Sequence, residues 1–265
     1  MYFWRVLTGG WVYVAALVAS FAVATVASPA GVSGAVLLLP FQVGVLGTPS
    51  PAVTPTNLLY NVVATPGALY RYWRQGQTGG KLTRTLLIGT LPGVIAGSVI
   101  RVELLPGQVS FEIVIASVLI PLGAWLLITR RPRRQGHWAP RPFVLTIVAA
   151  VVGCVGGIYG IGGGAILAPI LIGSGRPAAE VAPATLASTF VTSVAGVATF
   201  VVLSLHHRGS IAPDWGVGLA LGIGGLLGGY VGARLQPRLP ESAIRHLLGL
   251  LVLIIGIRYA WLAAG

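Results

Sequence analysis

Ser33 is the first residue whose sequence context predicts chemistry. The segment 31–34 reads GVSG and sets Ser33 between two glycines in an apolar run. Some intramembrane proteases use a G-x-S-G serine as the nucleophile and a histidine on a neighbouring helix as its base. The histidines of this chain, His137, His206, His207 and His246, fall in polar loops or near the ends of apolar segments. Because none is centred in such a segment, proteolysis by Ser33 is only a remote alternative, and we expect no catalytic residue.

Two later stretches present hydroxyl and amide side chains at helical spacing. In TPTNLLYN (54–61) two asparagines are four residues apart, and in APATLASTFVTS (182–193) two threonines repeat that spacing, so each pair shares one helix face. Such groups can donate hydrogen bonds to an oxyanion, or they can bond neighbouring helices and their own backbone. The candidate side chains are Thr56, Asn57, Asn61, Thr185, Ser188 and Thr189.

The composition places these residues in a membrane protein. The chain has 265 residues, of which 55% are hydrophobic and 8% charged, whereas soluble domains contain about 25% charged residues. Apolar runs of roughly 20 residues, each long enough to cross a bilayer, recur along the chain. The net charge of +12 comes from Lys and Arg at the ends of those runs, where the positive-inside rule places them. We therefore expect an all-α polytopic protein in a lipid bilayer and no nucleic-acid partner.

The apolar segments form two sets of four. We place them at 11–47, 51–71, 84–103 and 109–129, and at 143–173, 181–205, 213–233 and 242–262. As one straight helix, the first segment of either set would be roughly 45–55 Å long, which exceeds a hydrocarbon core of about 30 Å. Each of these two segments also has a glycine cluster in its middle. We therefore expect the chain to break there and to return toward the side that it entered.

The two sets resemble each other, which indicates an internal duplication. GVSGAVLLLP (31–40) lines up with IGGGAILAP (161–169), so that Ser33 matches Gly163. Further on, LIGTLPGVIAGSVIR (87–101) matches LGIGGLLGGYVGARL (221–235). A bent first segment leaves three crossings in each half, and an odd number of crossings inverts one half relative to the other. The predicted fold is therefore two inverted repeats, each with a glycine-broken, re-entrant-like first segment followed by three transmembrane helices.

Basic residues predict the domains and the topology. A linker at 130–142, which holds five arginines, divides the chain into a first membrane repeat, 1–129, and a second, 143–265. With bent first segments, this linker and the basic loops at 71–84 and 234–245 all face one side, which the positive-inside rule makes cytoplasmic. With unbroken first segments the loop at 234–245 would change sides. The charges therefore favour the bend and place both termini outside.

The two breaks are the predicted substrate site. Irregular backbone survives in a bilayer only inside protein or beside water, and paired breaks in inverted halves indicate a binding site near the midplane. After each break a short helix restarts, at about Ala35 and Ala165. Its first N–H groups lack partners and carry the positive end of the helix dipole, so they suit an anion. The backbone part of the predicted site is Ser33, Gly34, Ala35, Gly162, Gly163, Gly164 and Ala165.

Few groups are placed for cation or metal chemistry. The acidic residues, Glu103, Glu112, Glu180, Asp214 and Glu241, lie at or near segment ends. A cation site or proton relay in the membrane normally uses buried carboxylates, so their placement favours an anionic or neutral substrate. The single cysteine, Cys154, excludes a site with several thiolate ligands. We expect neither a metal nor a cofactor.

The glycine break, the proline after it, the Thr/Ser-rich helix, the basic linker and the ending GYVGARL…LLGLLVLIIGIRYA together resemble the TauE/SafE family. The resemblance covers nearly the whole chain and is most specific at GIYGIGGGAILAPIL (157–171), whereas the first half has GVSG in place of the family's fuller glycine run. It implies a multi-pass protein of the bacterial inner membrane that exports sulfite or a small organosulfur anion such as a sulfonate. An anion channel and an uptake permease on the same scaffold are the alternatives, and a homo-oligomer is compatible with all three.

Overall fold

Helices make up the regular structure of this protein. The computed structural model describes residues 10–48, 52–77, 80–104, 142–206 and 211–264, with single positions between 113 and 128. No strand occurs in these ranges, and six of the described helices are long and apolar enough to cross a membrane. The chain is therefore an all-α polytopic membrane protein, as predicted. Just over half of the segment predicted at 109–129, and all of the linker predicted at 130–142 except Pro142, lie outside the described residues.

The first half opens with a broken helix pair. Helix α1 (Trp11–Ala27) continues into the 3-10 turn η1 (Ser28–Ala30), the chain breaks, and it restarts as the short helix α2 (Ala35–Gly44). Two long helices follow, α3 (Val53–Arg74) and α4 (Lys81–Glu103). The expected break in the long first segment is thus present, at the glycines of GVSG.

The second half repeats this order. Its elements are α6 (Pro142–Tyr159), α7 (Gly164–Gly173), α8 (Ala178–Ser204), α9 (Trp215–Leu235), the 3-10 turn η2 (Gln236–Arg238) and α10 (Glu241–Ala264). Helix α6 breaks before α7 as α1 breaks before α2, so both long first segments are bent pairs. The inverted relation between the two halves stays a prediction.

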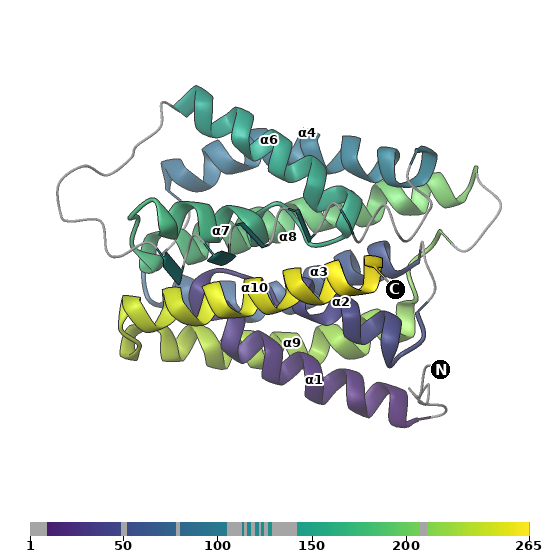
Figure 1. Ribbon diagram of the computed structural model, residues 1–265, viewed down its shortest axis with the longest axis horizontal. Coiled ribbons are helices and arrows are strands. Elements are labelled where there is room, and N and C mark those ends of the chain that lie inside the picture. The colour runs from purple at the N-terminus through teal and green to yellow at the C-terminus, as the bar shows by residue number, and fades with distance from the viewer. Residues whose placement is uncertain are drawn as a thin grey trace.

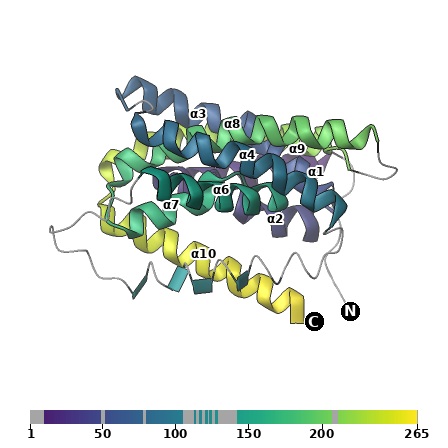
Figure 2. The ribbon, with the colours of Figure 1, turned by 90° about the horizontal axis from the view of Figure 1, so that it is seen from above.

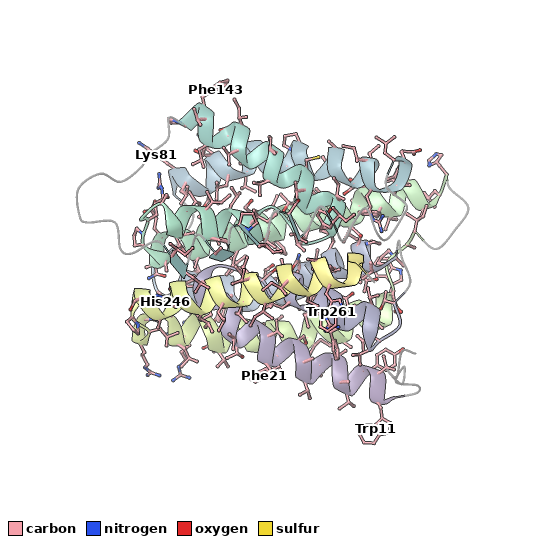
Figure 3. The ribbon with its side chains drawn as sticks, in the orientation of Figure 1. Trp11, Phe21, Lys81, Phe143, His246 and Trp261 are labelled. Atoms are coloured by element: carbon pink, nitrogen blue, oxygen red, sulfur yellow. The ribbon has the colours of Figure 1, made fainter. Side chains whose placement is uncertain are left out.

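The ends of the helices agree with the bent topology. Figure 3 shows Lys81, Phe143 and His246 at one end of the molecule and Trp11 and Trp261 at the other. The basic loop before α4, the start of α6 and the start of α10 therefore share one end. Unbroken first segments would have sent the start of α10 to the opposite end. That this basic end faces the cytoplasm stays a prediction.

The long helices pack as two bundles that mix the two halves. Helix α4 packs against α6 and α8 along the top and middle of Figure 1, and α9 packs against α1 and α3 along the bottom. The two bundles meet where α3 lies against α8. Helix α10 lies along one side of the molecule (Figure 2), where it touches α7, α2 and η1.

Glycine ridges bring the helices of each bundle into close contact. Gly89, Gly93 and Gly97 face the backbone of α6, where a Cβ added at Gly93 would lie 2.2 Å from the Ala150 carbonyl oxygen. In the matching segment of the second half, Gly224, Gly228 and Gly232 face the backbone of α1 in the same way. Small residues at such spacing let membrane helices approach closely. The two aligned segments thus do the same work, each against the first helix of the opposite half.

Candidate functional site

The first break depends on two left-handed glycines. Gly31 ends η1 with a φ of 78°, and Gly34 caps α2 with a φ of 87°, a conformation that residues with a side chain rarely adopt. Between them, the carbonyl of Ser33 accepts a hydrogen bond from the hydroxyl of Tyr60. The Ser33 Oγ lies 3.4 Å from the amide nitrogen of Ala35 and accepts from it. Ser33 therefore supports the start of α2.

Nothing in the described part of the chain equips Ser33 for proteolysis. His206 and His246, the histidines that the structure describes, are exposed and bond to carbonyls of their own helices. Within the same ranges, no three His, Cys, Asp or Glu side chains come together in a way that could hold a metal ion.

The second break has the same ingredients. Gly160 and Gly162 have φ values of 70° and 69°, and α7 then begins at Gly164, one residue before the predicted start at Ala165. Both α2 and α7 have glycine at the N-cap, Gly34 and Gly163, and glycine has no side chain that could accept a hydrogen bond from the first turn. In α2 the Ala35 N–H donates to Ser33 Oγ, and the other first-turn N–H groups of the two helices point into the breaks without a side-chain cap from the N-cap residue.

The two breaks meet at one turn of α8. The Thr185 hydroxyl lies 2.9 Å from the carbonyl oxygen of Gly31 and 2.9 Å from that of Val181 in its own helix, so its one proton is shared between the two acceptors. On the other side, a Cβ added at Gly164 would lie 2.0 Å from the Thr185 carbonyl oxygen. The residues that precede α2 and the residue that starts α7 thus contact the same residue of α8. This is the proximity that a shared site between the breaks requires.

Several of the predicted side chains are engaged in holding this frame. Asn57 donates through Nδ2 to the carbonyl of Ala35 over 3.1 Å, and its Oδ1 accepts from Gln42 Nε2 over 2.8 Å, so it ties α3 to α2. The Ser188 hydroxyl bonds the Thr90 hydroxyl over 2.9 Å and ties α8 to α4. These two residues and Thr185 have partners already.

Thr56 lies apart from the breaks. Its hydroxyl donates to the Ala52 carbonyl over 2.7 Å and accepts from the backbone N–H of Asp214 over 2.8 Å. Asp214 is the N-cap of α9 and accepts from Val217 N–H. Thr56 therefore anchors the start of α9, and the structure does not bring it to the other predicted residues.

Other buried polar atoms at the second break have no partner. Among the residues that the structure describes, both amide atoms of Asn61, the Oγ1 of Thr189 and the Oγ of Ser193 find no hydrogen-bond partner, although all three side chains are 0% exposed. A Cβ added at Gly164 would lie 2.4 Å from Thr189 Oγ1, and one at Gly162 would lie 3.3 Å from Ser193 Oγ. The two hydroxyls therefore border the break and the start of α7. Buried polar groups normally have hydrogen-bond partners, so the lack of partners at these atoms calls for an explanation, such as a bound ligand.

Asn61 lies at the level of these hydroxyls. Near the start of α3, Leu58 contacts Gly196 of α8. Near the end of α3, Tyr72 packs in one cluster with Ala182, which lies near the start of α8. The two helices are therefore antiparallel, and this register sets Asn61 at the level of residues 189–193. Asn61 is one turn beyond Asn57, which faces α2. Of the predicted side chains, Asn61 and Thr189 are the ones left free for a ligand.

Three contributors were missed at the sequence level. Ser193 continues the four-residue spacing of Thr185 and Thr189, so the same pattern would have found it. Gln42 is a lone amide in the apolar helix α2, and its partner Asn57 becomes known only when α2 folds back onto α3. Arg101 was hidden at the end of an apolar segment, where it reads as a membrane-interface residue.

Arg101 is buried beside the second break. It is 1% exposed, and its Nε lies 3.5 Å from the Oγ1 of Thr54, which in turn donates to the Ile158 carbonyl near the end of α6. A Cβ added at Gly160 would lie 2.3 Å from the Thr54 carbonyl oxygen. The guanidinium thus belongs to the network that surrounds the second break. Placing such a charge within a membrane segment is costly, and it usually serves a function.

Known proteins resemble this chain over nearly its whole length. The profile of the family described as "Sulfite exporter TauE/SafE" matches residues 16–259. A "Probable membrane transporter protein" of Xylella fastidiosa (strain 9a5c) is 27% identical over 250 residues, which cover 87% of this chain and 88% of that protein. The "Probable membrane transporter protein YjnA" of Bacillus subtilis (strain 168) is 26% identical, with 86% of this chain and 92% of that protein covered. Because the family match spans both bent segments and every long helix described here, the chain belongs to the TauE/SafE family.

Proposed function

We propose that this protein transports a small sulfur oxyanion, sulfite or a sulfonate, across the bacterial inner membrane. The family description and the names of the relatives support a membrane transporter. The observation that favours an anion is the meeting of two glycine-capped helix starts beside the unpartnered side chains of Thr189 and Asn61. Exposed N–H groups at helix starts bind anions because the dipole and the hydrogen bonds act together.

In this proposal the backbone binds the anion and the side chains complete its shell. The Ala35 N–H already donates to Ser33 Oγ. The next N–H in the first turn of α2, that of Val36, and the N–H groups of Gly164 and Ala165 in α7 donate to the oxyanion oxygens. The Thr189 hydroxyl and the Asn61 amide, which have no protein partner, donate to the remaining lone pairs. The anion must leave its water behind to enter the membrane interior, so these donors replace the lost hydration.

Other predicted residues have supporting roles in this proposal. Glycines 34, 162 and 163 let the backbone reach the anion, and Ser33 orients the start of α2 through its Oγ. Asn57, Thr185 and Ser188 hold the surrounding helices through the bonds described above. Thr56 plays no direct part, because its hydroxyl is bonded at the start of α9.

The moving parts follow the packing of the helices. One body consists of α1, α3 and α9, the other of α4, α6 and α8, and they meet at α3 and α8. Sliding at that interface would expose the site to either end in turn, as in other transporters with mid-membrane sites. Movement of the sequence-defined halves, 1–129 and 143–265, against each other would instead break the glycine-lined contacts of α4 with α6 and of α9 with α1.

Export needs no coupled ion in this scheme. An inside-negative potential favours the exit of an anion by about 2.3 kcal/mol per charge per 100 mV. The described buried residues include no Asp or Glu that could serve as a proton relay. We therefore propose electrogenic efflux from the basic end toward the end that carries the termini.

The test is sulfite flux through the full-length chain in liposomes under an imposed potassium diffusion potential. Thr189→Val removes a hydroxyl that has no protein partner, so we expect flux to fall at least tenfold, about 1.4 kcal/mol, with an unchanged melting temperature. Thr192→Val is the matched control: it is one turn away and equally buried, but its hydroxyl bonds only backbone carbonyls of its own helix. It should keep near-normal flux.

Two outcomes would overturn the proposal. One is flux of sulfite, sulfate and methanesulfonate through the wild-type protein no faster than through protein-free liposomes. The other is equal flux in the Thr189→Val and Thr192→Val proteins, or in Ala165→Leu and the wild type, since a leucine in the first turn of α7 would crowd the anion.

A further inference from the structure

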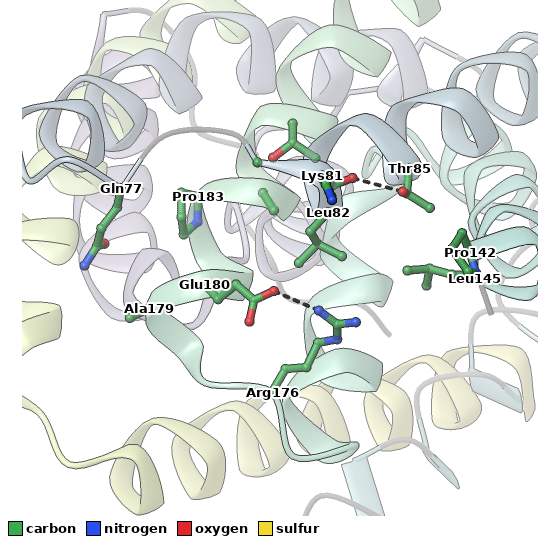
Figure 4. A pocket seen from close by; sticks show the side chains of 13 residues that line it. Gln77, Lys81, Leu82, Thr85, Pro142, Leu145, Arg176, Ala179, Glu180 and Pro183 are labelled. Carbon is green, nitrogen blue, oxygen red and sulfur yellow. Dashed lines mark hydrogen bonds and ion pairs between the residues drawn. The ribbon is translucent and has the colours of Figure 1, made fainter. Parts of the chain in front are cut away.

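A cavity of about 440 Å³ lies at the basic end of the molecule, apart from the breaks. Its walls come from the starts of three helices (Figure 4). They are Gly80, Lys81, Leu82, Thr83 and Thr85 at the start of α4, Pro142 and Leu145 of α6, and Ala179, Glu180, Pro183 and Ala184 of α8. Figure 3 shows Lys81 and Phe143 at this end. Each helix start contributes the positive end of its dipole and N–H groups without intrahelical partners. Three such ends around one cavity make it attractive to anions.

Charged side chains strengthen this field. Lys81 lines the cavity, and so do Arg176 and Glu180, which form an ion pair with a distance of 2.8 Å between Arg176 Nη1 and Glu180 Oε1. The Nε of Arg176 is buried and has no partner. In Figure 4 the Arg176–Glu180 pair lies across the cavity from Lys81 and Thr85. The lining therefore carries a net positive charge, with one carboxylate that holds one of the cations.

An unpartnered hydroxyl also belongs to the lining. Thr83 is 9% exposed, and its buried Oγ1 has no hydrogen-bond partner in the described ranges. The start of α4 has no side-chain cap at Gly80 either. A buried donor without a partner beside a helix start is the arrangement that an oxyanion would complete.

The cavity reaches almost to the breaks. Pro183 and Ala184 of α8 form part of its wall. The next residue, Thr185, donates to the carbonyl of Gly31 in the first break and contacts Gly164, the residue that follows the second break. An anion in the cavity is therefore separated from the proposed transport site by about one turn of α8.

We propose that this cavity is a loading vestibule, a second site where the anionic substrate binds before it moves to the breaks. The loading vestibule consists of Lys81, Thr83, Arg176, Glu180, Pro183 and Ala184. Its ligands are the same small oxyanions, so this inference rests on the proposed function. Lys81 and the three helix starts draw the anion in, and the substrate competes with Glu180 for Arg176. Glu180 keeps binding weak enough for the anion to move on.

The test is the concentration dependence of sulfite flux when sulfite is presented to the face that carries Lys81. For Lys81→Gln and Arg176→Gln we expect KM to rise about fivefold or more, because a focused positive field raises the local anion concentration by at least tenfold. The maximal rate should stay within about twofold, because the transport site is intact, and KM at the opposite face should not change. Arg84→Gln is the matched control, since Arg84 lies one turn beyond Lys81, is exposed and does not line the cavity.

Glu180→Gln gives a change of opposite sign. It frees Arg176, so KM at the same face should fall, a result that misfolding cannot produce. The vestibule is wrong if the Lys81, Arg176 and Glu180 variants all have the same KM for sulfite as Arg84→Gln. This conclusion applies when the wild type transports sulfite and Thr189→Val does not. In contrast, absence of flux in the wild type itself would refute the proposed function.

Discussion

The hydroxyl of Thr185 in α8 donates to the carbonyl of Gly31 over 2.9 Å, although the two residues are 154 positions apart in the chain. Gly164 lies against the carbonyl of the same threonine. One residue of α8 therefore contacts both breaks and sets the distance between them. The two helix starts can act on one ligand because this contact holds them together.

Removing that hydroxyl should loosen the site. Thr185→Val keeps the shape of the side chain but leaves the buried Gly31 carbonyl unpaired, which costs about 1–3 kcal/mol. We expect a lower melting temperature in detergent and weaker sulfite flux. Thr185→Ser retains the donor and should resemble the wild type in both measurements. A Thr185→Val protein as stable as the wild type would show that the bond contributes nothing to the frame.

The two asparagines of α3 should respond in opposite ways. Asn57→Leu removes the partners of Gln42 Nε2 and the Ala35 carbonyl, and each unsatisfied buried group costs about 1–3 kcal/mol. Asn61→Leu removes an amide that has no protein partner, so the protein should melt at the same or a higher temperature and lose flux. Thermal melting and liposome flux of both variants check this. If Asn61→Leu destabilises as much as Asn57→Leu, Asn61 is structural.

The glycine ridge of α4 should tolerate no side chain. In Gly93→Ala the new Cβ would lie 2.2 Å from the Ala150 carbonyl oxygen, and overpacking of this kind costs about 1–3 kcal/mol. Gly10→Ala is the control, because no atom of the described residues lies within 4 Å of a Cβ at Gly10. The fraction of protein that stays monodisperse after heating is the measurement. Equal survival of both variants would contradict the packing of α4 on α6.

A disulfide can identify the moving bodies. A Cβ at Gly229 of α9 would lie 3.5 Å from the Cβ of Ala68 of α3, within the range of about 3.5–4.5 Å that disulfides use. In a Cys154→Ala background, Ala68→Cys with Gly229→Cys should crosslink on oxidation without loss of flux, because α3 and α9 belong to one body. Loss of flux that dithiothreitol restores would instead show that the sequence-defined halves move against each other.

The charge of Arg101 should matter for transport. Arg101→Gln removes a buried positive charge near the second break, so we expect sulfite flux to fall about tenfold or more, equivalent to about 1.4 kcal/mol. Arg101→Lys keeps the charge and should retain a larger share of the flux. Flux and melting temperature are measured for both. Arg101 has only a packing role if both variants lower the melting temperature by the same amount and the folded fraction of each variant transports sulfite at the wild-type rate.

Much of the architecture could be predicted from local patterns. A bilayer sets the length of a spanning helix, so the runs of apolar residues located the long helices within a few positions. The same length limit made a first segment of more than thirty residues incompatible with one straight helix, and the glycines at 31–34 and 160–164 marked where it would break. The positions of the basic loops favoured the topology that places Lys81, Phe143 and His246 at one end.

The partners of the polar side chains could not be predicted in this way, because hydrogen bonding depends on which helices come together. From spacing alone, Asn57 and Asn61 were equivalent, and so were Thr185 and Thr189. The fold gives Asn57 partners in the preceding helix α2 and gives Thr185 a partner 154 positions away, and it leaves Asn61 and Thr189 without a partner among the described residues. Likewise, Arg101 resembled an interface residue until the packing of α4 between α6 and α8 buried it. Element lengths and breaks are encoded locally, whereas the division between residues that hold the frame and residues free for a ligand arises only when the helices fold back onto one another and bring separate segments into contact.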